Sequence, residues 1–158
     1  MTHPKAIGDR STLAIMLALQ DAGYAILVPF GENTRYDLVI DDGERLARVQ
    51  CKTGRLSNGA VRFPMCSTYA HHPNPRTPNR HYLGQVDYFA VYCLQAAAVY
   101  LIPISDIPLR RQAALRIEPP RNNQKLHIRY AEPYLVRSVR LAPSRAPGGA
   151  AGAEAPSA

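Results

Sequence analysis

The chain of 158 residues is long enough to form one globular domain with a substantial core. Hydrophobic residues make up 46% of it. The chain has 19 Lys and Arg, of which 16 are Arg, against 12 Asp and Glu, and its formal net charge of +7 favours a polyanionic partner. Three cysteines without paired spacing exclude a disulfide framework, and no apolar run approaches the roughly 20 residues that a membrane span needs. We therefore expect a cytoplasmic protein with no membrane partner.

The first predicted elements are a helix and a strand. A helix is expected over residues 9–22, and Gly23 ends it in the usual position after the last turn. Large apolar residues wrap most of its circumference, so we expect this helix to be largely buried. The first strand is predicted over residues 24–29.

A β-hairpin is predicted where residues 37–41 and 45–52 flank the dipeptide Asp42-Gly43. With the turn centred on this dipeptide, Asp37 faces Arg48, and Gln50 is its diagonal neighbour. Side chains alternate between the two faces of a strand, and one face is apolar, as a core requires: Leu38, Ile40, Ala47, Val49 and Cys51. The other face carries a carboxylate, an amide and two cations: Asp37, Arg48, Gln50 and Lys52.

The polar face of this hairpin suits a divalent metal ion beside a water molecule. Mg²⁺ prefers oxygen ligands, and Asp37 offers a charged oxygen, the Gln50 amide a neutral one and the Cys51 backbone carbonyl a third. Lys52 could activate the attacking water or neutralise charge that develops on a phosphate. The pattern points to phosphodiester hydrolysis, although polar residues at alternate strand positions more often mark a solvated face.

The stretch RYDLVIDDG…RVQCKTGRL resembles the PD-(D/E)XK nucleases, in particular the homing endonucleases associated with group I introns, in which Gln often takes the second acidic position. The stretches VPFGENTRYDL, DYFAVYC and EPPRNNQK extend the resemblance over about residues 5–134. It implies an α/β fold with a restriction-endonuclease-like core, in which helices flank a mixed central β-sheet. It also places the metal-binding carboxylate on Asp37, the amide ligand on Gln50 and the catalytic lysine on Lys52.

One position in the first helix departs from the family pattern. Relatives carry a Glu there, in a GDxxE-like context, which completes the metal site, whereas this chain has Thr12. A hydroxyl is a poorer Mg²⁺ ligand than a carboxylate. Asp9 is a candidate to replace it as metal ligand. The alternatives are that Asp9 caps the helix or occupies its first turn, or that the site lacks this ligand.

The second half of the chain is predicted to be mainly strands. Asn58-Gly59 predicts a tight turn into a strand over residues 60–65. A long proline-rich loop over residues 67–85 then precedes the remaining elements. These are two strands over residues 86–93 and 98–103, a short helix over 105–114 and a last strand over 114–118. The nuclease-like domain is thus expected over residues 1–136, followed by a disordered Ala/Pro/Gly-rich tail over 141–158.

Several residues outside the hairpin core are candidates for DNA contact. Arg35 and Arg48 lie close to the proposed site, and Arg76 and Arg80 lie in the long loop, for which a solvated loop is the alternative. A further set follows the last strand and suits hydrogen bonds to bases or phosphates: Arg121, Asn122, Asn123 and Gln124. An ordinary capped turn would also explain that set.

These features together predict a metal-dependent DNA endonuclease of homing or restriction type, with Asp37, Gln50 and Lys52 as catalytic residues. The expected cofactor is Mg²⁺ or Mn²⁺, and the expected partner is double-stranded DNA. The alternative function is a catalytically impaired DNA-binding module on the same fold, which Thr12 motivates. Because a small subunit must cut two strands, we also expect a homo-oligomer, either a dimer or a tetramer.

Overall fold

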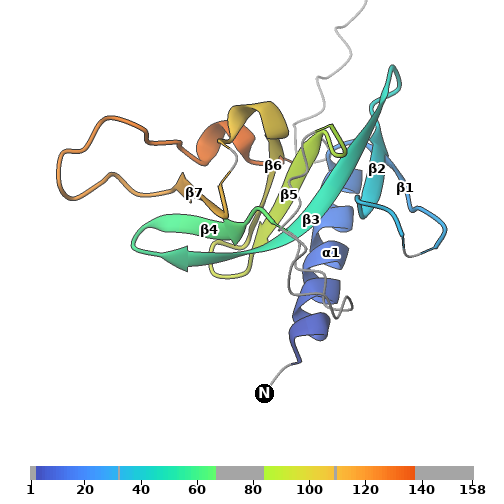
Figure 1. The fold of residues 1–158 in the computed structure, drawn as a ribbon, viewed down its shortest axis with the longest axis horizontal. Helices are drawn as coiled ribbons and strands as arrows, with labels where there is room; N and C mark the ends of the chain where they lie inside the picture. The colour runs from blue at the N-terminus through green and yellow to red at the C-terminus, as the bar shows by residue number, and fades with distance from the viewer. Residues whose placement is uncertain (1–2, 32, 67–83, 109, 138–158) are drawn as a thin grey trace, which may run out of the picture.

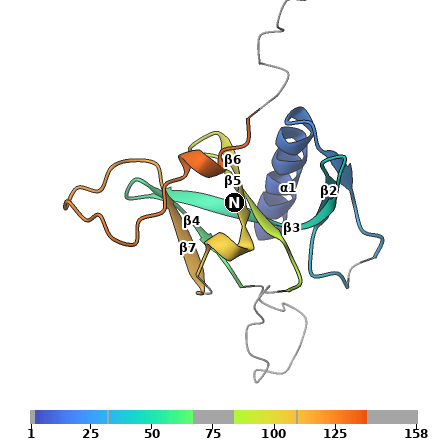
Figure 2. The same ribbon diagram turned by 90° about the horizontal axis from the view of Figure 1, so that it is seen from above.

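A computed structural model describes residues 3–31, 33–66, 84–108 and 110–137. It shows one mixed β-sheet with a long helix packed beside it (Figures 1 and 2). The predicted tail over residues 141–158 lies outside the described residues, as does most of the predicted loop over 67–85. No helix among the described residues is long and apolar enough to cross a membrane.

Helix α1 (Pro4–Asp21) begins five residues before the predicted start. Proline is favoured in the first helical turn, where its missing N–H has no intrahelical acceptor to lose. Gly23, with a φ of 100°, follows the end of the helix as predicted. The prediction of burial around most of the circumference is wrong, because Leu13 and Leu17 are 67% and 62% exposed. The buried residues form one stripe at every fourth position: Ser11, Ile15 and Leu19.

Strand β3 (Leu46–Ser57) organises the sheet, because strands pair with it along both edges. Its first half pairs antiparallel with β2 (Leu38–Asp41), which in turn pairs with β1 (Ala25–Leu27). From Val49 to Gly54 it pairs in parallel with β5 (Tyr88–Cys93), which makes the sheet mixed, and β5 pairs with β6 (Ala98–Pro103). Its last residues pair with β4 (Ala60–Pro64) across the predicted Asn58-Gly59 turn, and β4 pairs with β7 (Gln112–Arg116).

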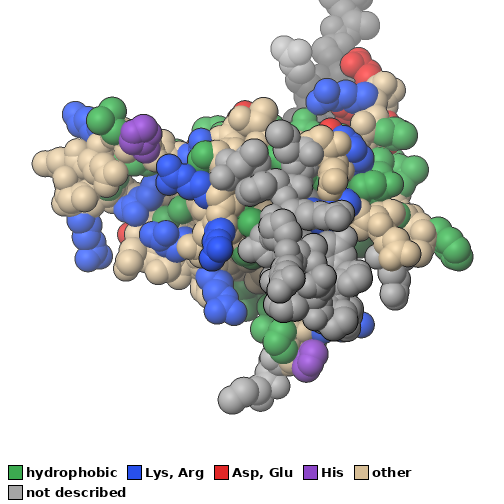
Figure 3. All heavy atoms as spheres, in the orientation of Figure 1, with side chains coloured by type: hydrophobic (Ala, Val, Ile, Leu, Met, Phe, Trp, Pro, Cys, Tyr) green, Lys and Arg blue, Asp and Glu red, His purple; other side chains and the backbone are tan. Residues whose placement is uncertain are grey.

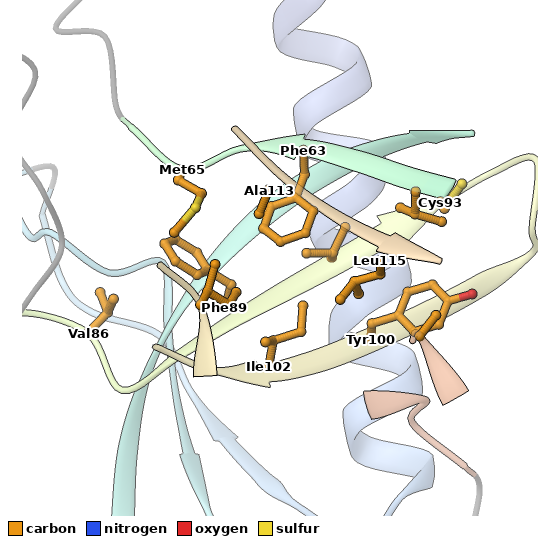
Figure 4. Close-up of a cluster of buried hydrophobic side chains, with 13 residues drawn as sticks. Phe63, Met65, Val86, Phe89, Cys93, Tyr100, Ile102, Ala113 and Leu115 are labelled. Carbon is orange, nitrogen blue, oxygen red and sulfur yellow. The ribbon is translucent and has the colours of Figure 1, made fainter. Parts of the chain in front are cut away.

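Two hydrophobic clusters lie on opposite faces of this sheet. The first packs the buried stripe of α1 against the apolar face of the β2–β3 hairpin, where Leu38, Ile40 and Val49 are buried as predicted. The second lies between β4 and β7 on one side and β5 and β6 on the other (Figure 4). Phe63 and Phe89 meet there, with ring centroids 6.1 Å apart. Strands β4 and β7 thus cover the face of β5 that α1 leaves open.

Gly54 allows β4 and β5 to pack closely against β3. A Cβ atom at this position would come within 2.6 Å of a Val61 methyl group and 2.8 Å of a Val91 methyl group. Real Cβ atoms do not approach so closely, so a side chain at residue 54 would push β4 away from β5. The glycine therefore holds β3 and β4 in their present arrangement.

The predicted helix over residues 105–114 is wrong. The structure forms a short 3₁₀ turn, η1 (Ile104–Asp106), and then strand β7, which begins two residues before the predicted last strand. Ala113 and Leu115 in β7 are buried and alternate with more exposed residues, which is the period of a strand. A second 3₁₀ turn, η2 (Glu132–Tyr134), lies near the end of the described chain.

Candidate active site

The loop between β2 and β3 is longer than the predicted two residues. Asp42 Oδ1 accepts hydrogen bonds from the N–H groups of Glu44 and Arg45, both at 2.9 Å, which stabilises a four-residue loop. Arg48 therefore lies opposite Val39, and its predicted pairing with Asp37 is wrong. The displacement is two residues, an even number, so every side chain keeps its predicted face.

Asp37 lies at the point where β2 separates from β3. Its N–H donates to the Val49 carbonyl at 2.9 Å, which is the last main-chain hydrogen bond that the described residues form between the two segments at this end. Farther along β3, the Asp37 side chain takes the place of a main-chain acceptor. Asp37 Oδ2 accepts from the Cys51 N–H at 2.8 Å and from Gln50 Nε2 at 2.6 Å. The carboxylate is therefore fixed against the open edge of β3, and Gln50 is its immediate neighbour.

Three oxygen atoms belong to the residues predicted to bind a metal ion at this edge. Because Gln50 donates from its NH₂ group to Asp37 Oδ2, its Oε1 remains an acceptor for another ligand. In a strand the N–H and C=O of one residue point to the same side, so the Cys51 carbonyl points to the edge where Asp37 binds the Cys51 N–H. Asp37 Oδ1 completes the set. One charged and two neutral oxygens suit Mg²⁺, which keeps several water ligands.

This donor set contains a single acidic side chain. No cluster of three or more His, Cys, Asp or Glu residues occurs within the described part of the chain. A cation at this edge would therefore depend on Asp37 for charge and on neutral oxygens for the rest of its protein ligands.

Burial controls the protonation of the groups at this edge. It raises the pKa of Asp37, and the hydrogen bond from Cys51 and the nearby Lys52 ammonium act in the opposite direction. Ionising the Asp37 carboxyl group costs free energy because burial removes its hydration. A cation bound beside the carboxylate would offset that cost. Burial and the nearby Asp37 charge also raise the pKa of the Cys51 thiol, so the sulfur remains a neutral thiol.

Lys52 and helix α1 border the same edge. Lys52 Nζ lies 3.5 Å from the Cys66 carbonyl oxygen. The Thr12 hydroxyl donates to the Gly8 carbonyl at 3.1 Å and interacts with the Cys51 thiol, so α1 brings position 12 close to β3. Asp9 is exposed in the second turn of α1, and the predicted role as cap or first-turn residue is therefore wrong.

The arginines predicted to contact DNA near the site already have protein partners. Arg48 forms a two-pronged ion pair with Asp87, with both N–O distances at 3.1 Å. Arg35 Nε donates to Gln85 Oε1 at 2.5 Å. Both bonds tie the hairpin to the segment just before β5. No role is predicted for Asp87 from the sequence, although an acidic residue immediately before a buried strand is a recognisable signal.

The other candidate DNA contacts are remote from the hairpin or outside the described residues. Arg76 and Arg80 belong to the latter group. The loop after β7 projects from the end of the sheet opposite α1 and β2 (Figures 1 and 2). There, Arg121, Asn122 and Gln124 line a pocket of about 520 Å³, and Asn123 has a φ of 53°. Lys and Arg side chains gather on the face shown in Figure 3, over the β3–β4 hairpin and β7.

The pKa shift of Asp37 predicts a pH-dependent gain in stability for Asp37→Asn. A raised carboxyl pKa means that folding favours the protonated form, so this contribution is present below pH 3.8 and is lost as the pH rises through the folded-state pKa. Asparagine avoids that loss. In EDTA, the variant should melt at a higher temperature than wild type at neutral pH, with the difference shrinking toward pH 3.8. Thermal unfolding followed by circular dichroism measures this, and a constant difference across the pH range would contradict it.

Comparison with known proteins places the chain among nucleases. Residues 2–137 match a family model described as PD-(D/E)XK endonuclease. The structure is similar to that of a bacterial homing endonuclease, with a TM-score of 0.59 and 26% sequence identity over 85% of this chain and 88% of that chain. A Holliday junction resolvase from Archaeoglobus fulgidus is less similar, with a TM-score of 0.41 and 16% identity over 69% of this chain and 83% of that chain. No match was found among curated proteins. The family match and the first structure confirm the predicted α/β, restriction-endonuclease-like fold class.

Proposed function

Because this chain belongs to the PD-(D/E)XK endonuclease family, we propose that it cleaves the phosphodiester backbone of double-stranded DNA with Mg²⁺ or Mn²⁺ as cofactor. The observation that carries the proposal is the open edge of β3. There, the Asp37 carboxylate is held by Gln50 at 2.6 Å and by the Cys51 N–H at 2.8 Å. Lys52 is the next residue along the same strand.

In this proposal each group at the edge has a separate role. Asp37 Oδ1 and the Cys51 carbonyl would hold the metal ion, and Gln50 would complete the protein ligands while it orients the carboxylate. The chemistry supplied by such a cation would be Lewis acidity toward a water molecule and the phosphate. Lys52 orients or deprotonates that water, or neutralises charge on the phosphate. Cys51 contributes only its main chain, because its thiol stays neutral.

We also propose the homing type of this activity and an oligomeric assembly. The homing endonuclease similarity extends over 85% of this chain, and Gln50 stands where the family commonly has a second acid. Each edge holds one carboxylate and serves one phosphodiester bond, so cutting both strands of a duplex requires two copies of the chain. A dimer or a tetramer with two-fold symmetry meets that requirement.

A second function has its own supporting observation. The Thr12 hydroxyl, at the position where relatives place a metal-binding Glu, donates to the Gly8 carbonyl. With a single acidic side chain at the edge, the chain could instead be a DNA-binding module whose cleavage activity is impaired. Such a protein would retain DNA affinity but not cut.

Supercoiled plasmid distinguishes these functions. We expect conversion to nicked and linear forms with Mg²⁺ or Mn²⁺ and no conversion in EDTA. Retarded plasmid migration without conversion would support the impaired module. The absence of both conversion and retardation would show that neither function is correct.

A glutamate at position 12 should strengthen the metal site. Thr12→Glu adds a charged oxygen beside Cys51, so the Mg²⁺ concentration for half-maximal cleavage should fall by on the order of tenfold. Thr12→Gln is the matched control, because it has the same shape without the charge, and should not produce this gain. Metal titrations of plasmid cleavage measure both variants.

Asp9→Ala tests whether Asp9 already supplies the missing carboxylate. Asp9 is exposed and caps no helix, so cleavage and melting temperature should both stay close to wild type. A loss of cleavage at unchanged stability would instead make Asp9 a metal ligand.

A further inference from the structure

A basic pocket lies directly beside Lys52. Its volume is about 630 Å³, and it lies between the first turns of α1 and the strands β3 and β4. Among the described residues that line it, three are cations and none is acidic: Lys52, Arg55 and Arg62. The wall on the side of α1 includes Gly8, which has no side chain. The pocket therefore combines open volume with an excess of basic over acidic side chains among its described lining residues.

Arg55 and Arg62 face each other across the β3–β4 ladder. They are register partners, both are exposed, and neither has a hydrogen bond or ion pair with any described residue. Directly opposed like charges destabilise an antiparallel pair. Two other arginines, by contrast, have protein partners: Arg48 forms an ion pair with Asp87, and Arg116 donates to three carbonyl groups. The Arg55–Arg62 pair thus has the character of an anion site rather than of a structural contact.

The position of the pair relates it to the proposed cleavage site. Arg55 follows Lys52 by three residues on β3, which corresponds to roughly 10 Å along the strand, and this odd separation directs the two side chains to opposite faces of it. Guanidinium groups bind phosphate through two parallel hydrogen bonds, and two such groups on neighbouring strands can hold one phosphate from two sides. The pocket leads from Lys52 to these two groups without an acidic residue among its described lining.

We propose that Arg55 and Arg62 together bind one backbone phosphate of the DNA near the phosphate that is cleaved. This inference rests on the proposed function and adds a positioning site to it. The contact carries no base information, because phosphates are the same at every step. It fixes where the duplex lies relative to Asp37 and Lys52.

The test is DNA affinity measured in EDTA, where cleavage is not expected to occur. Fluorescence anisotropy with a short labelled duplex, at several KCl concentrations, compares wild type with Arg55→Gln, Arg62→Gln and the double variant. The double variant should bind about tenfold more weakly, with a salt slope reduced by about one unit, as for one lost phosphate contact. Because both residues hold the same phosphate, each single variant should already show most of that loss.

A double variant of Arg45→Gln and Arg137→Gln is the charge-matched control. Both residues form surface ion pairs outside this pocket, with Asp42 and Glu132 respectively, and such pairs contribute little to stability. This control should keep wild-type affinity. The melting temperature of the Arg55/Arg62 double variant should equal or exceed that of wild type, because a like-charge pair has been removed.

A substitution on the opposite wall tests the pocket without touching either arginine. A Cβ atom at Gly8 would meet nothing within 4 Å, so a longer side chain fits there. Gly8→Glu should weaken DNA binding, because it places a negative charge in the pocket, whereas Gly8→Gln should bind clearly more tightly than Gly8→Glu. Equal affinities of these two variants would contradict the inference.

Failure of this inference is distinguishable from failure of the proposed function. If wild type cleaves plasmid but the Arg55/Arg62 double variant binds DNA like its control, the phosphate site is wrong and the nuclease remains. If wild type binds without cleaving and the double variant is weakened, the phosphate site is supported on an impaired module. If wild type neither binds nor cleaves DNA, both proposals are overturned.

Discussion

Asp37→Asn should reduce metal-dependent plasmid cleavage by on the order of a thousandfold or more, since it removes the charged oxygen that we propose binds the metal ion. Asparagine has nearly the same shape, and its oxygen can still accept the hydrogen bonds that Cys51 and Gln50 donate to Asp37. The fold and the basic surfaces should therefore persist, and DNA affinity in EDTA should remain close to that of wild type. Initial cleavage rates and anisotropy titrations on the same preparations measure the two effects.

Asp41→Asn is the matched control for this prediction. Asp41 is the last residue of β2, the strand that follows Asp37, and its carboxylate accepts a hydrogen bond from the Gly43 N–H in the hairpin loop. The substitution changes charge and shape in the same way as Asp37→Asn, but at a residue away from the open edge. The Asp41→Asn variant should therefore cleave plasmid at a rate near that of wild type. Wild-type cleavage by Asp37→Asn would refute the metal assignment. A higher melting temperature together with lost cleavage would show that Asp37 is retained for activity at a cost in stability.

Lys52→Met is the second substitution with a large expected effect. Methionine keeps the length of the side chain but removes the ammonium group, so cleavage should fall by on the order of a hundredfold to a thousandfold. The loss should appear in the maximal rate at saturating DNA rather than in affinity, because the role proposed for this lysine is on the reacting groups. Single-turnover cleavage at several protein concentrations separates these two effects.

The same variant should shift the pH dependence of any residual cleavage. The Lys52 ammonium lowers the pKa of Asp37, so its removal should raise that pKa further. The acidic limb of the rate profile should then move to higher pH than in wild type. Lys125→Met is the control, because Lys125 is an exposed cation in the loop after β7, and it should change neither the rate nor the profile. Full activity of Lys52→Met would exclude a catalytic role for this lysine.

Local patterns were sufficient for much of the sheet. The alternation of Leu38, Ile40, Ala47 and Val49 correctly predicted the buried face of the hairpin, because strand side chains alternate whatever the strands pair with. Asn58 and Gly59 predicted the β3–β4 turn, since both adopt the positive φ values that this turn requires. These features depend only on neighbouring residues.

Predictions that depended on longer-range pairing were less accurate. The helix expected over residues 105–114 is partly strand β7, because pairing with β4 favours an extended backbone there. The hairpin register moved by two residues because Asp42 accepts two main-chain hydrogen bonds that a pairing rule does not include. Arg35 and Arg48 bind Gln85 and Asp87, which lie 50 and 39 residues later in the chain, and no spacing rule predicts these pairs.

For the candidate site, the residue types and the face that Asp37, Gln50 and Lys52 share follow from the local pattern alone. The departure of β2 from β3 at Asp37, which lets a carboxylate bind the Cys51 N–H in a partly desolvated position, is visible only in the folded chain. The same holds for the placement of Arg55 opposite Arg62. The physical reason is that side-chain alternation is a local property of a strand, whereas unpaired edges, burial and cross-strand neighbours depend on where distant segments pack.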